Sequence, residues 1–220
     1  MESRRPVCIL PSGGKRYLKK LPRSFYVRPT LRVARDLLGK YLVRVSNGKR
    51  LITRIVETEA YCQDDPASHA FSGRTRRNDV MFWKGGHLYV YFTYGMHFCA
   101  NVVTGEEGAG EAVLIRAVEP LEGVEEMTRN RARPTRRIAF RASHELVPAA
   151  DLTNGPAKLC QALDIRREQD GTDLLGDEIY LLGAPRLTAS KVGRSTRIGI
   201  VKGVEKNWRF FVKESRWVSR

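Results

Sequence analysis

Apolar and polar residues alternate along several stretches of the chain, and an alternation with a period of two is typical of strands that bury one face. Asn47-Gly48 lies between two of these stretches and is a strong signal for a hairpin turn. A second hairpin is predicted from the two stretches that flank Gly95. The stretches that predict strands are residues 41–46, 51–61, 88–93, 98–103, 112–118, 178–182, 196–201 and 208–213.

Helical periodicity is found in shorter parts of the chain. Residues 30–38 carry leucine and alanine on one face, and Gly39 follows them as a stop signal. Residues 120–131 and 156–163 predict two more helices, because each range begins with a proline, which is favoured in a first helical turn. Hairpin strands with helices between them predict an α+β fold with a mainly antiparallel sheet and flanking helices.

The length and composition favour a single compact domain. The chain has 220 residues, of which 42% are hydrophobic, and this is enough for a substantial core. It has no internal repeat and no long linker, so we expect one domain over residues 23–220. Residues 1–22 are basic and interrupted by proline and glycine, and they predict a flexible N-terminal arm.

The charge of the chain narrows the class of partner. Lysine and arginine number 39 against 24 acidic residues, a formal net charge of +15. Such an excess favours a polyanionic partner, with nucleic acid first and an anionic membrane second. No apolar run approaches the roughly 20 residues of a membrane-spanning helix, and the N-terminus lacks the apolar core of a secretion signal. We therefore expect an intracellular protein that acts on nucleic acid, with DNA as its site of action, and not on a membrane. A single domain without an obvious apolar face for oligomerisation predicts a monomer.

The cysteines give little support for a metal site. They are Cys8, Cys62, Cys99 and Cys160, which lie far apart and form no C-x-x-C pair. This spacing fits reduced thiols inside the cell. We expect neither a bound metal nor another cofactor.

One candidate for chemistry is the run RIVETEAY at residues 54–61. Because side chains alternate along a strand, Glu57, Glu59 and Tyr61 share one face and Val56, Thr58 and Ala60 the other. The charged face has to meet water, a cation or a functional site. A solvated strand face is the more frequent explanation of such a pattern.

The other candidate is LYVYFTYGMHFCAN at residues 88–101. Tyr94 falls at its predicted turn beside Gly95, where a large ring is poorly placed for a core. It suits a wedge that enters a base stack and holds a nucleotide out. An aromatic ring buried at the turn is the alternative.

Loop residues add possible contacts to DNA. His69 lies in an apparent loop and can donate a hydrogen bond to a ligand or a phosphate, although a lone loop histidine is more often a surface residue. Arg76 and Arg77 belong to a basic run that we interpret as a phosphate contact. Residues 129–141 hold six arginines and no acidic residue, and with this net charge we interpret them as contacts to the DNA backbone. A solvated helix end and loop is the alternative there.

Several motifs occur together in one order, and this makes a chance similarity improbable. The chain resembles the alkyladenine (3-methyladenine) DNA glycosylase family from about residue 23 to the C-terminal WVS. The motifs that carry the resemblance are RIVETEAY, ASHAFSG, TRRND, LYVYFTYGMHFCAN, LIRAVEPLEG and NGPAKLCQAL.

The resemblance implies a role for each matching residue. Glu59 matches the general base that activates water, and Arg116 an arginine near that water. Asn101 matches the residue that excludes guanine through its exocyclic amino group. The residues that match the walls of the base pocket are Tyr61, His69 and Tyr91, and those that match the DNA-contacting surface are Tyr94, Met96, His97 and Lys158.

The resemblance also implies a fold and a reaction. The fold is one α+β domain around a curved antiparallel sheet, without a required metal. The reaction is hydrolysis of the N-glycosidic bond of alkylated or deaminated purines in duplex DNA, such as 3-methyladenine, 7-methylguanine and hypoxanthine, which leaves an abasic site. Two other interpretations are a non-catalytic nucleic-acid-binding protein, in which Glu59 is incidental, and a peripheral membrane protein with a basic surface.

Overall fold

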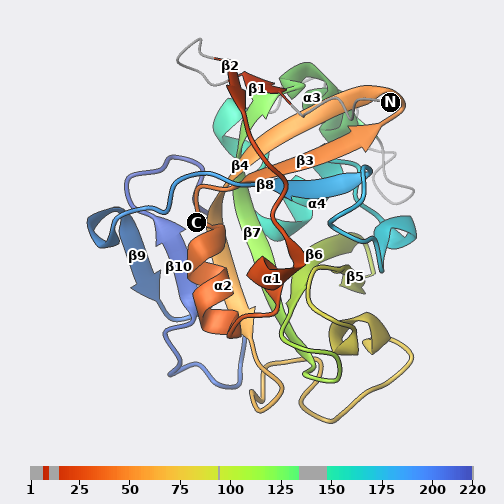
Figure 1. Cartoon of the computed structure of the whole chain (residues 1–220), viewed down its shortest axis with the longest axis vertical. Coiled ribbons are helices and arrows are strands. Elements are labelled where there is room, and N and C mark those ends of the chain that lie inside the picture. The colour runs from red at the N-terminus through yellow and green to blue at the C-terminus, as the bar shows by residue number, and fades with distance from the viewer. Residues whose placement is uncertain (1–6, 10–14, 94, 134–147, 220) are drawn as a thin grey trace.

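A thirteen-residue strand, β4 (Lys49–Tyr61), lies at the centre of the fold. The computed structural model describes residues 7–9, 15–93, 95–133 and 148–219. In these ranges an antiparallel sheet of eight strands has the order β5-β6-β7-β4-β10-β9, and β3 pairs with both β4 and β8. The sheet curls around β4, and Figure 1 shows α2 across one side of it and α4 behind.

The other elements flank this sheet. Its remaining strands are β3 (Tyr41–Ser46), β5 (Leu88–Thr93), β6 (His97–Thr104), β7 (Glu111–Glu122), β8 (Ile179–Leu182), β9 (Val192–Ser195) and β10 (Arg209–Val212). The α-helices are α1 (Arg23–Tyr26), α2 (Thr30–Leu37), α3 (Val124–Ala132) and α4 (Pro156–Ala162). Short 3-10 helices are Asp79–Phe82, Ala149–Asp151, Arg167–Gln169 and Ala189–Lys191, and a separate hairpin pairs β1 (Val7–Ile9) with β2 (Lys15–Tyr17). The prediction of an α+β fold is confirmed.

Both faces of β4 are buried in its second half. On one face the Thr58 hydroxyl donates a hydrogen bond to the carbonyl of Ala34 in α2, 2.8 Å away. On the other face Glu57 and Glu59 are fully buried. A buried carboxylate is stable only with hydrogen-bond donors or cations around it. The charged face of this strand therefore meets cations rather than water.

The prediction that a helix begins at Pro120 is wrong. Strand β7 continues through Pro120, which pairs with Thr53 beside a shift in register, where a residue without an N–H is tolerated. The strand ends at Glu122, and the next residue is Gly123, whose φ is +79° and whose Cβ, if it had one, would lie 2.5 Å from Leu51. The helix begins at Val124.

The strand predicted over residues 196–201 is also wrong. Strand β9 ends at Ser195, and the following segment is a loop. The N–H of Ile198 donates to the Glu59 carboxylate instead of to a neighbouring strand. A side chain distant in sequence therefore replaces the strand partner here.

The N-terminal arm falls partly outside the described residues, and its flexibility stays a prediction. Within the described part of the chain, every helix is too short or too polar to traverse a lipid bilayer.

Candidate active site

Irregular pairing of β4 with β7 shapes the site. The register shifts between Ile55 and Glu57 and again between Glu57 and Thr58, so that Val56 and Arg116 are skipped in the pairing. Such shifts bend a strand and redirect its side chains, and they are frequent beside active sites. Here they surround Glu57 and bring Arg116 close to both glutamates of β4.

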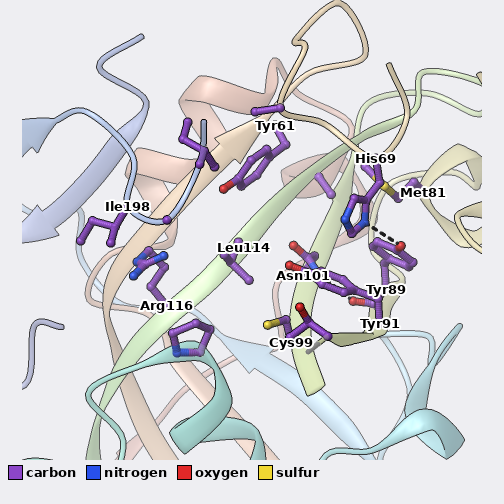
Figure 2. Close-up of a pocket in the computed structure, with 16 residues that line it drawn as sticks. Tyr61, His69, Met81, Tyr89, Tyr91, Cys99, Asn101, Leu114, Arg116 and Ile198 are labelled. Carbon is purple, nitrogen blue, oxygen red and sulfur yellow. Dashed lines mark hydrogen bonds between the residues drawn. The ribbon is translucent and has the colours of Figure 1, made fainter. Parts of the chain in front are cut away.

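A cavity of about 390 Å³ opens next to these strands. Figure 2 shows its lining, with Tyr61 at one side and a cluster around His69 at another. The loop after β9 contributes three consecutive residues, and Pro156 comes from the start of α4. The lining residues from the strands include Tyr61 of β4, Tyr89 and Tyr91 of β5, Cys99 and Asn101 of β6, and Leu114 and Arg116 of β7.

Three rings form one wall of the cavity. The His69 and Tyr91 rings meet edge to face with centroids 4.4 Å apart, and His69 Nδ1 lies 3.0 Å from the Tyr89 hydroxyl. Desolvation by its neighbours and the charge of Arg77 lower the pKa of His69, which favours a neutral imidazole at pH 7. Burial raises the pKa of Tyr91, so its phenol keeps its proton. This wall is aromatic and uncharged.

Asn101 and Cys99 lie at the base of this wall on β6. The side-chain amide of Asn101 donates to the carbonyl of Tyr89 at 3.1 Å, which fixes the orientation of the amide. Burial raises the pKa of Cys99, so it is a neutral thiol. Both residues are buried but contribute to the lining, so their polar atoms border the cavity.

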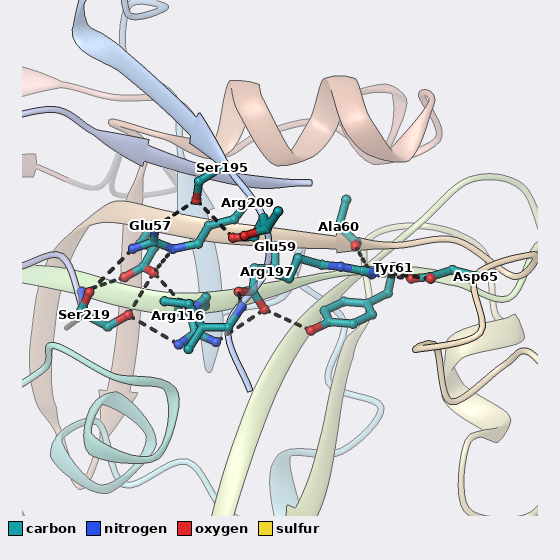
Figure 3. A network of polar contacts seen from close by, with 12 residues as sticks. Glu57, Glu59, Ala60, Tyr61, Asp65, Arg116, Ser195, Arg197, Arg209 and Ser219 are labelled. Atoms are coloured by element: carbon teal, nitrogen blue, oxygen red, sulfur yellow. Dashed lines mark hydrogen bonds and ion pairs between the residues drawn. The ribbon is translucent and has the colours of Figure 1, made fainter. Parts of the chain in front are cut away.

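The Glu59 carboxylate lies directly behind the lining rather than in it. Its side chain is 0% exposed, but all of its hydrogen-bond donors belong to lining residues. The Tyr61 hydroxyl donates to Oε2 at 2.9 Å, and Arg116 Nη1 donates to the same oxygen at 3.3 Å (Figure 3). The Ile198 N–H donates to Oε1 at 2.8 Å. Each hydrogen bond of the Glu59 carboxylate therefore comes from a residue that lines the cavity.

Glu57 holds the arginine from the other side. It accepts hydrogen bonds from Arg116 Nε at 3.0 Å and from Arg209 Nε at 2.6 Å. The backbone N–H and the hydroxyl of Ser219 donate to it at 2.7 and 2.8 Å. Figure 3 shows this network around the two glutamates. Arg116 is therefore held between two carboxylates.

The buried carboxylates of this network raise the pKa values of Arg116 and Tyr61. Burial alone would lower the pKa of Arg116, but the carboxylates of Glu59 and Glu57 raise it, so the guanidinium stays charged. Burial and the Glu59 charge raise the pKa of Tyr61, so its phenol stays protonated and donates to Glu59. Among the described residues no group of three or more His, Cys, Asp or Glu side chains could hold a metal ion.

The predicted DNA contacts have varied surroundings. Met96 is 43% exposed at the tip of the β5–β6 hairpin, and Arg76 and Arg77 are exposed. His97 is half-buried, and its Nδ1 has no hydrogen-bond partner among the described residues. Lys158 is engaged with Asp151 at 3.1 Å and Asn154 at 2.8 Å.

Tyr94 lies outside the described residues, as does most of the arginine-rich run over residues 129–141. The arginines of that run that are described have internal partners. Arg129 and Arg133 pair with Glu126, and Arg131 donates to Gln161. In this part of the run the arginines are therefore better explained as a solvated helix end with internal ion pairs than as side chains free to contact phosphates.

Sequence reasoning did not identify several residues of the site. Tyr89 alternates with Tyr91 on the same strand, and this signal was available in the sequence. The other residues come from distant parts of the chain and carry no local signal: Arg197, Ile198, Gly199, Ile200, Arg209 and Ser219.

Comparison with known proteins agrees with this geometry. Residues 24–216 match the family described as methylpurine-DNA glycosylase (MPG). A relative from Carboxydothermus hydrogenoformans is 48% identical over 201 residues, which cover 91% of this chain and 98% of the relative. One from Chlorobium phaeovibrioides is 45% identical, covering 92% and 98%, and one from Francisella tularensis is 44% identical, covering 87% and 94%.

All three relatives carry the name "Putative 3-methyladenine DNA glycosylase". The match to the family spans nearly the whole described domain and includes every strand that lines the cavity. The interpretation as a non-catalytic binding protein is therefore wrong. The chain belongs to the methylpurine-DNA glycosylase family, and it is a DNA glycosylase.

Proposed function

We propose that this enzyme extrudes alkylated or deaminated purines from duplex DNA and hydrolyses their N-glycosidic bond with a water activated by Glu59. One observation carries this proposal: the buried Glu59 carboxylate is hydrogen-bonded to Tyr61 and Arg116, and both of these residues line an aromatic cavity. A carboxylate beside a slot for a flat base is the arrangement that this hydrolysis requires.

The aromatic walls suit a damaged purine. Alkylation of a ring nitrogen gives the base a positive charge, and such a base is attracted to the faces of Tyr61 and Tyr91 by about 1–2 kcal/mol when water is excluded. A neutral His69 adds no opposing charge. Stacking returns about 1–3 kcal/mol for each ring, against an extrusion cost of a few kcal/mol that is smallest for weakly paired bases.

Asn101 is suited to select among purines. Its amide is fixed by the bond to the Tyr89 carbonyl, so it cannot rotate freely to make room for a larger base edge. We propose that it excludes guanine by collision with the exocyclic amino group. The candidate substrates are 3-methyladenine and hypoxanthine, which lack this amino group, and 7-methylguanine. The last of these carries the amino group, so we propose that its cationic ring, which stacks more strongly and leaves more readily, offsets the collision.

The reaction follows from the charges of the site. Departure of the base develops positive charge on the sugar, as in glycoside hydrolysis. Glu59 accepts the proton of the attacking water and stabilises this cation, and general-base help is typically worth ~10²–10⁴-fold. Arg116 donates a hydrogen bond to the Glu59 carboxylate and helps to hold its orientation. The product is an abasic site.

A covalent mechanism through lysine is not favoured. None of the described residues that line the cavity is a lysine, so an amine that could form a Schiff base with the sugar is not in place. We therefore propose a monofunctional enzyme that does not cut the strand. A protein–DNA adduct trapped by borohydride would contradict this part of the proposal.

DNA contact is proposed for the surface around the cavity. Met96 at the hairpin tip, together with Tyr94, is proposed to fill the gap left by the extruded base. The exposed Arg76 and Arg77 are proposed to contact phosphates. The enzyme is proposed to act as a monomer wherever the cell keeps its DNA, and no observation favours a membrane instead.

The test uses duplex DNA with one alkylated adenine or hypoxanthine, incubated with the enzyme and then treated with alkali. The wild type should give a strand break at the lesion only after alkali. Glu59→Gln should bind the duplex and give no break. Glu119→Gln removes a carboxylate that pairs with Arg54 outside the cavity, and it should retain the activity. Normal cutting by Glu59→Gln would show that the assignment of the base is wrong.

A further inference from the structure

Arg197 is the most deeply enclosed arginine near the cavity. Its side chain is 0% exposed, compared with 9% for Arg116 and 11% for Arg209, and it is not a lining residue. A guanidinium does not lose its proton in a protein, so a buried one is stable only with acceptors around it. Both terminal nitrogens of Arg197 have acceptors, and its Nε has none among the described residues. The acceptors of Arg197 therefore show what this residue holds together.

Its guanidinium joins three segments of the chain. It pairs with the Asp65 carboxylate through both terminal nitrogens. Nη1 also donates to the carbonyl of Ala60 at 3.1 Å, and Nη2 donates to the carbonyl of Gly203 at 3.1 Å. Ala60 is adjacent to Glu59 on β4, so one of these contacts lies beside the candidate general base (Figure 3).

The same guanidinium stacks on a wall of the cavity. Its central carbon lies 4.7 Å from the centroid of the Tyr61 ring and 5.2 Å from that of Trp208. Because Arg197 is enclosed and lies outside the lining, the ring face that it covers is closed to a ligand. A base can stack only on the remaining face, and Arg197 fixes the plane of that face.

The backbone that follows Arg197 reaches the site itself. The N–H of Ile198 donates to Glu59 Oε1 at 2.8 Å, and residues 198–200 line the cavity. We propose that Arg197 is a positioning residue that fixes Tyr61 and the Ile198 amide and thereby orients the Glu59 carboxylate toward the attacking water. This proposal rests on the proposed role of Glu59 as the general base.

Gly203 lies against the Arg197–Asp65 ion pair, and Arg197 with its partners Ala60, Asp65 and Gly203 is called the clamp below. A Cβ at this position would lie 2.7 Å from Asp65 Oδ1 and 3.0 Å from Arg197 Nη2, and the φ of +59° is unfavourable for other residues. Gly203→Ala therefore disturbs the clamp while Arg197 itself is kept. It gives a perturbation that is independent of any change in charge.

The experiment compares single-turnover excision with the enzyme in saturating excess over lesion-containing duplex. Arg197→Lys keeps a cation opposite Asp65, so the fold is retained, but an ammonium cannot reproduce the planar fork or the stacking. We expect the rate to fall by about 10²-fold, the effect of a small misplacement of reacting groups. The affinity for undamaged duplex should stay at the wild-type value. Gly203→Ala should lower the same rate.

A matched control comes from the preceding strand. Arg194 is an exposed arginine whose guanidinium carbon lies 5.6 Å from the Phe210 ring, and Arg194→Lys should excise at the wild-type rate. A wild-type rate for Arg197→Lys overturns the proposal. A loss of rate that only matches the folded fraction measured by circular dichroism overturns it as well.

The outcome can be separated from that of the proposed function. If Glu59→Gln excises normally, the proposed function fails whatever Arg197→Lys does. If Glu59→Gln is inactive and Arg197→Lys is unimpaired, only the positioning role fails.

Discussion

Two glutamates on one face of β4 are equally buried but have different surroundings. Glu57 accepts hydrogen bonds from Arg209 and Ser219, which do not line the cavity, as well as from Arg116. The donors to Glu59 are all lining residues. The first glutamate therefore holds Arg116 from the side away from the cavity, and the second lies against the lining itself.

The Tyr61 side chain makes two kinds of contact that substitution can distinguish, a hydrogen bond from its hydroxyl and packing of its ring. Tyr61→Phe keeps the ring against Arg197 but removes the hydrogen bond to Glu59 Oε2. A hydrogen bond to a charged group contributes about 1.5–3 kcal/mol, so we expect a single-turnover rate at least about tenfold lower with little change in lesion affinity. Tyr61→Ala should also weaken lesion binding by about 1–3 kcal/mol, because the stacking surface is lost. Equal lesion affinities for the two variants would contradict a stacking role.

The candidate residues on the strands could be found from the sequence, either by alternation or by resemblance. Tyr61, Tyr91, Asn101 and Arg116 line one cavity, and Glu59 lies directly behind Tyr61 and Arg116. The partners that complete the site could not be found this way. Ile198 and Ser219 reach the glutamates across 139 and 162 residues of sequence, and no local pattern encodes such contacts.

At the scale of elements, local signals succeeded where local chemistry decides the structure. The hairpin at Asn47-Gly48 is confirmed, with positive φ angles of 50° and 72° at the two turn residues. The boundary at Pro120 was wrong because a shifted register lets a strand continue through proline. The prediction of a strand over residues 196–201 was wrong because the buried Glu59 carboxylate accepts a backbone hydrogen bond from that loop.

Gly123 tests how strictly the end of β7 is specified. An alanine there combines a positive φ with a contact of 2.5 Å to the Leu51 side chain, and we expect the free energy of unfolding to fall by about 2–4 kcal/mol. Gly48→Ala is the matched control, because Gly48 also has a positive φ but no atom within 4 Å of the added Cβ. It should cost about 1–2 kcal/mol. Urea denaturation measures both variants, and equal losses would show that the packing against Leu51 is not limiting.

At the scale of the whole molecule, the net positive charge and the cavity are expected to contribute differently to binding and catalysis. The net charge of +15 favours association with any duplex, damaged or not. The site beside the cavity is nearly balanced, since Arg116, Arg197 and Arg209 meet Glu57, Glu59 and Asp65. Long-range attraction therefore comes from the surface, and the proposed selection of the base is left to the shape and rings of the cavity. This division predicts that salt affects binding and catalysis differently.

Raising the salt concentration should weaken binding to undamaged duplex steeply and leave the single-turnover rate at saturating enzyme unchanged. The logarithm of the affinity falls with the logarithm of salt by roughly 0.9 for each phosphate that the protein neutralises. Arg76→Gln removes one exposed cation of the proposed phosphate-contacting run and should reduce that slope by about 1. Lys213→Gln makes the same change of charge at a different cavity and should leave the slope as it is. Equal slopes for the two variants would mean that attraction is spread over the whole surface and that Arg76 has no particular place on DNA.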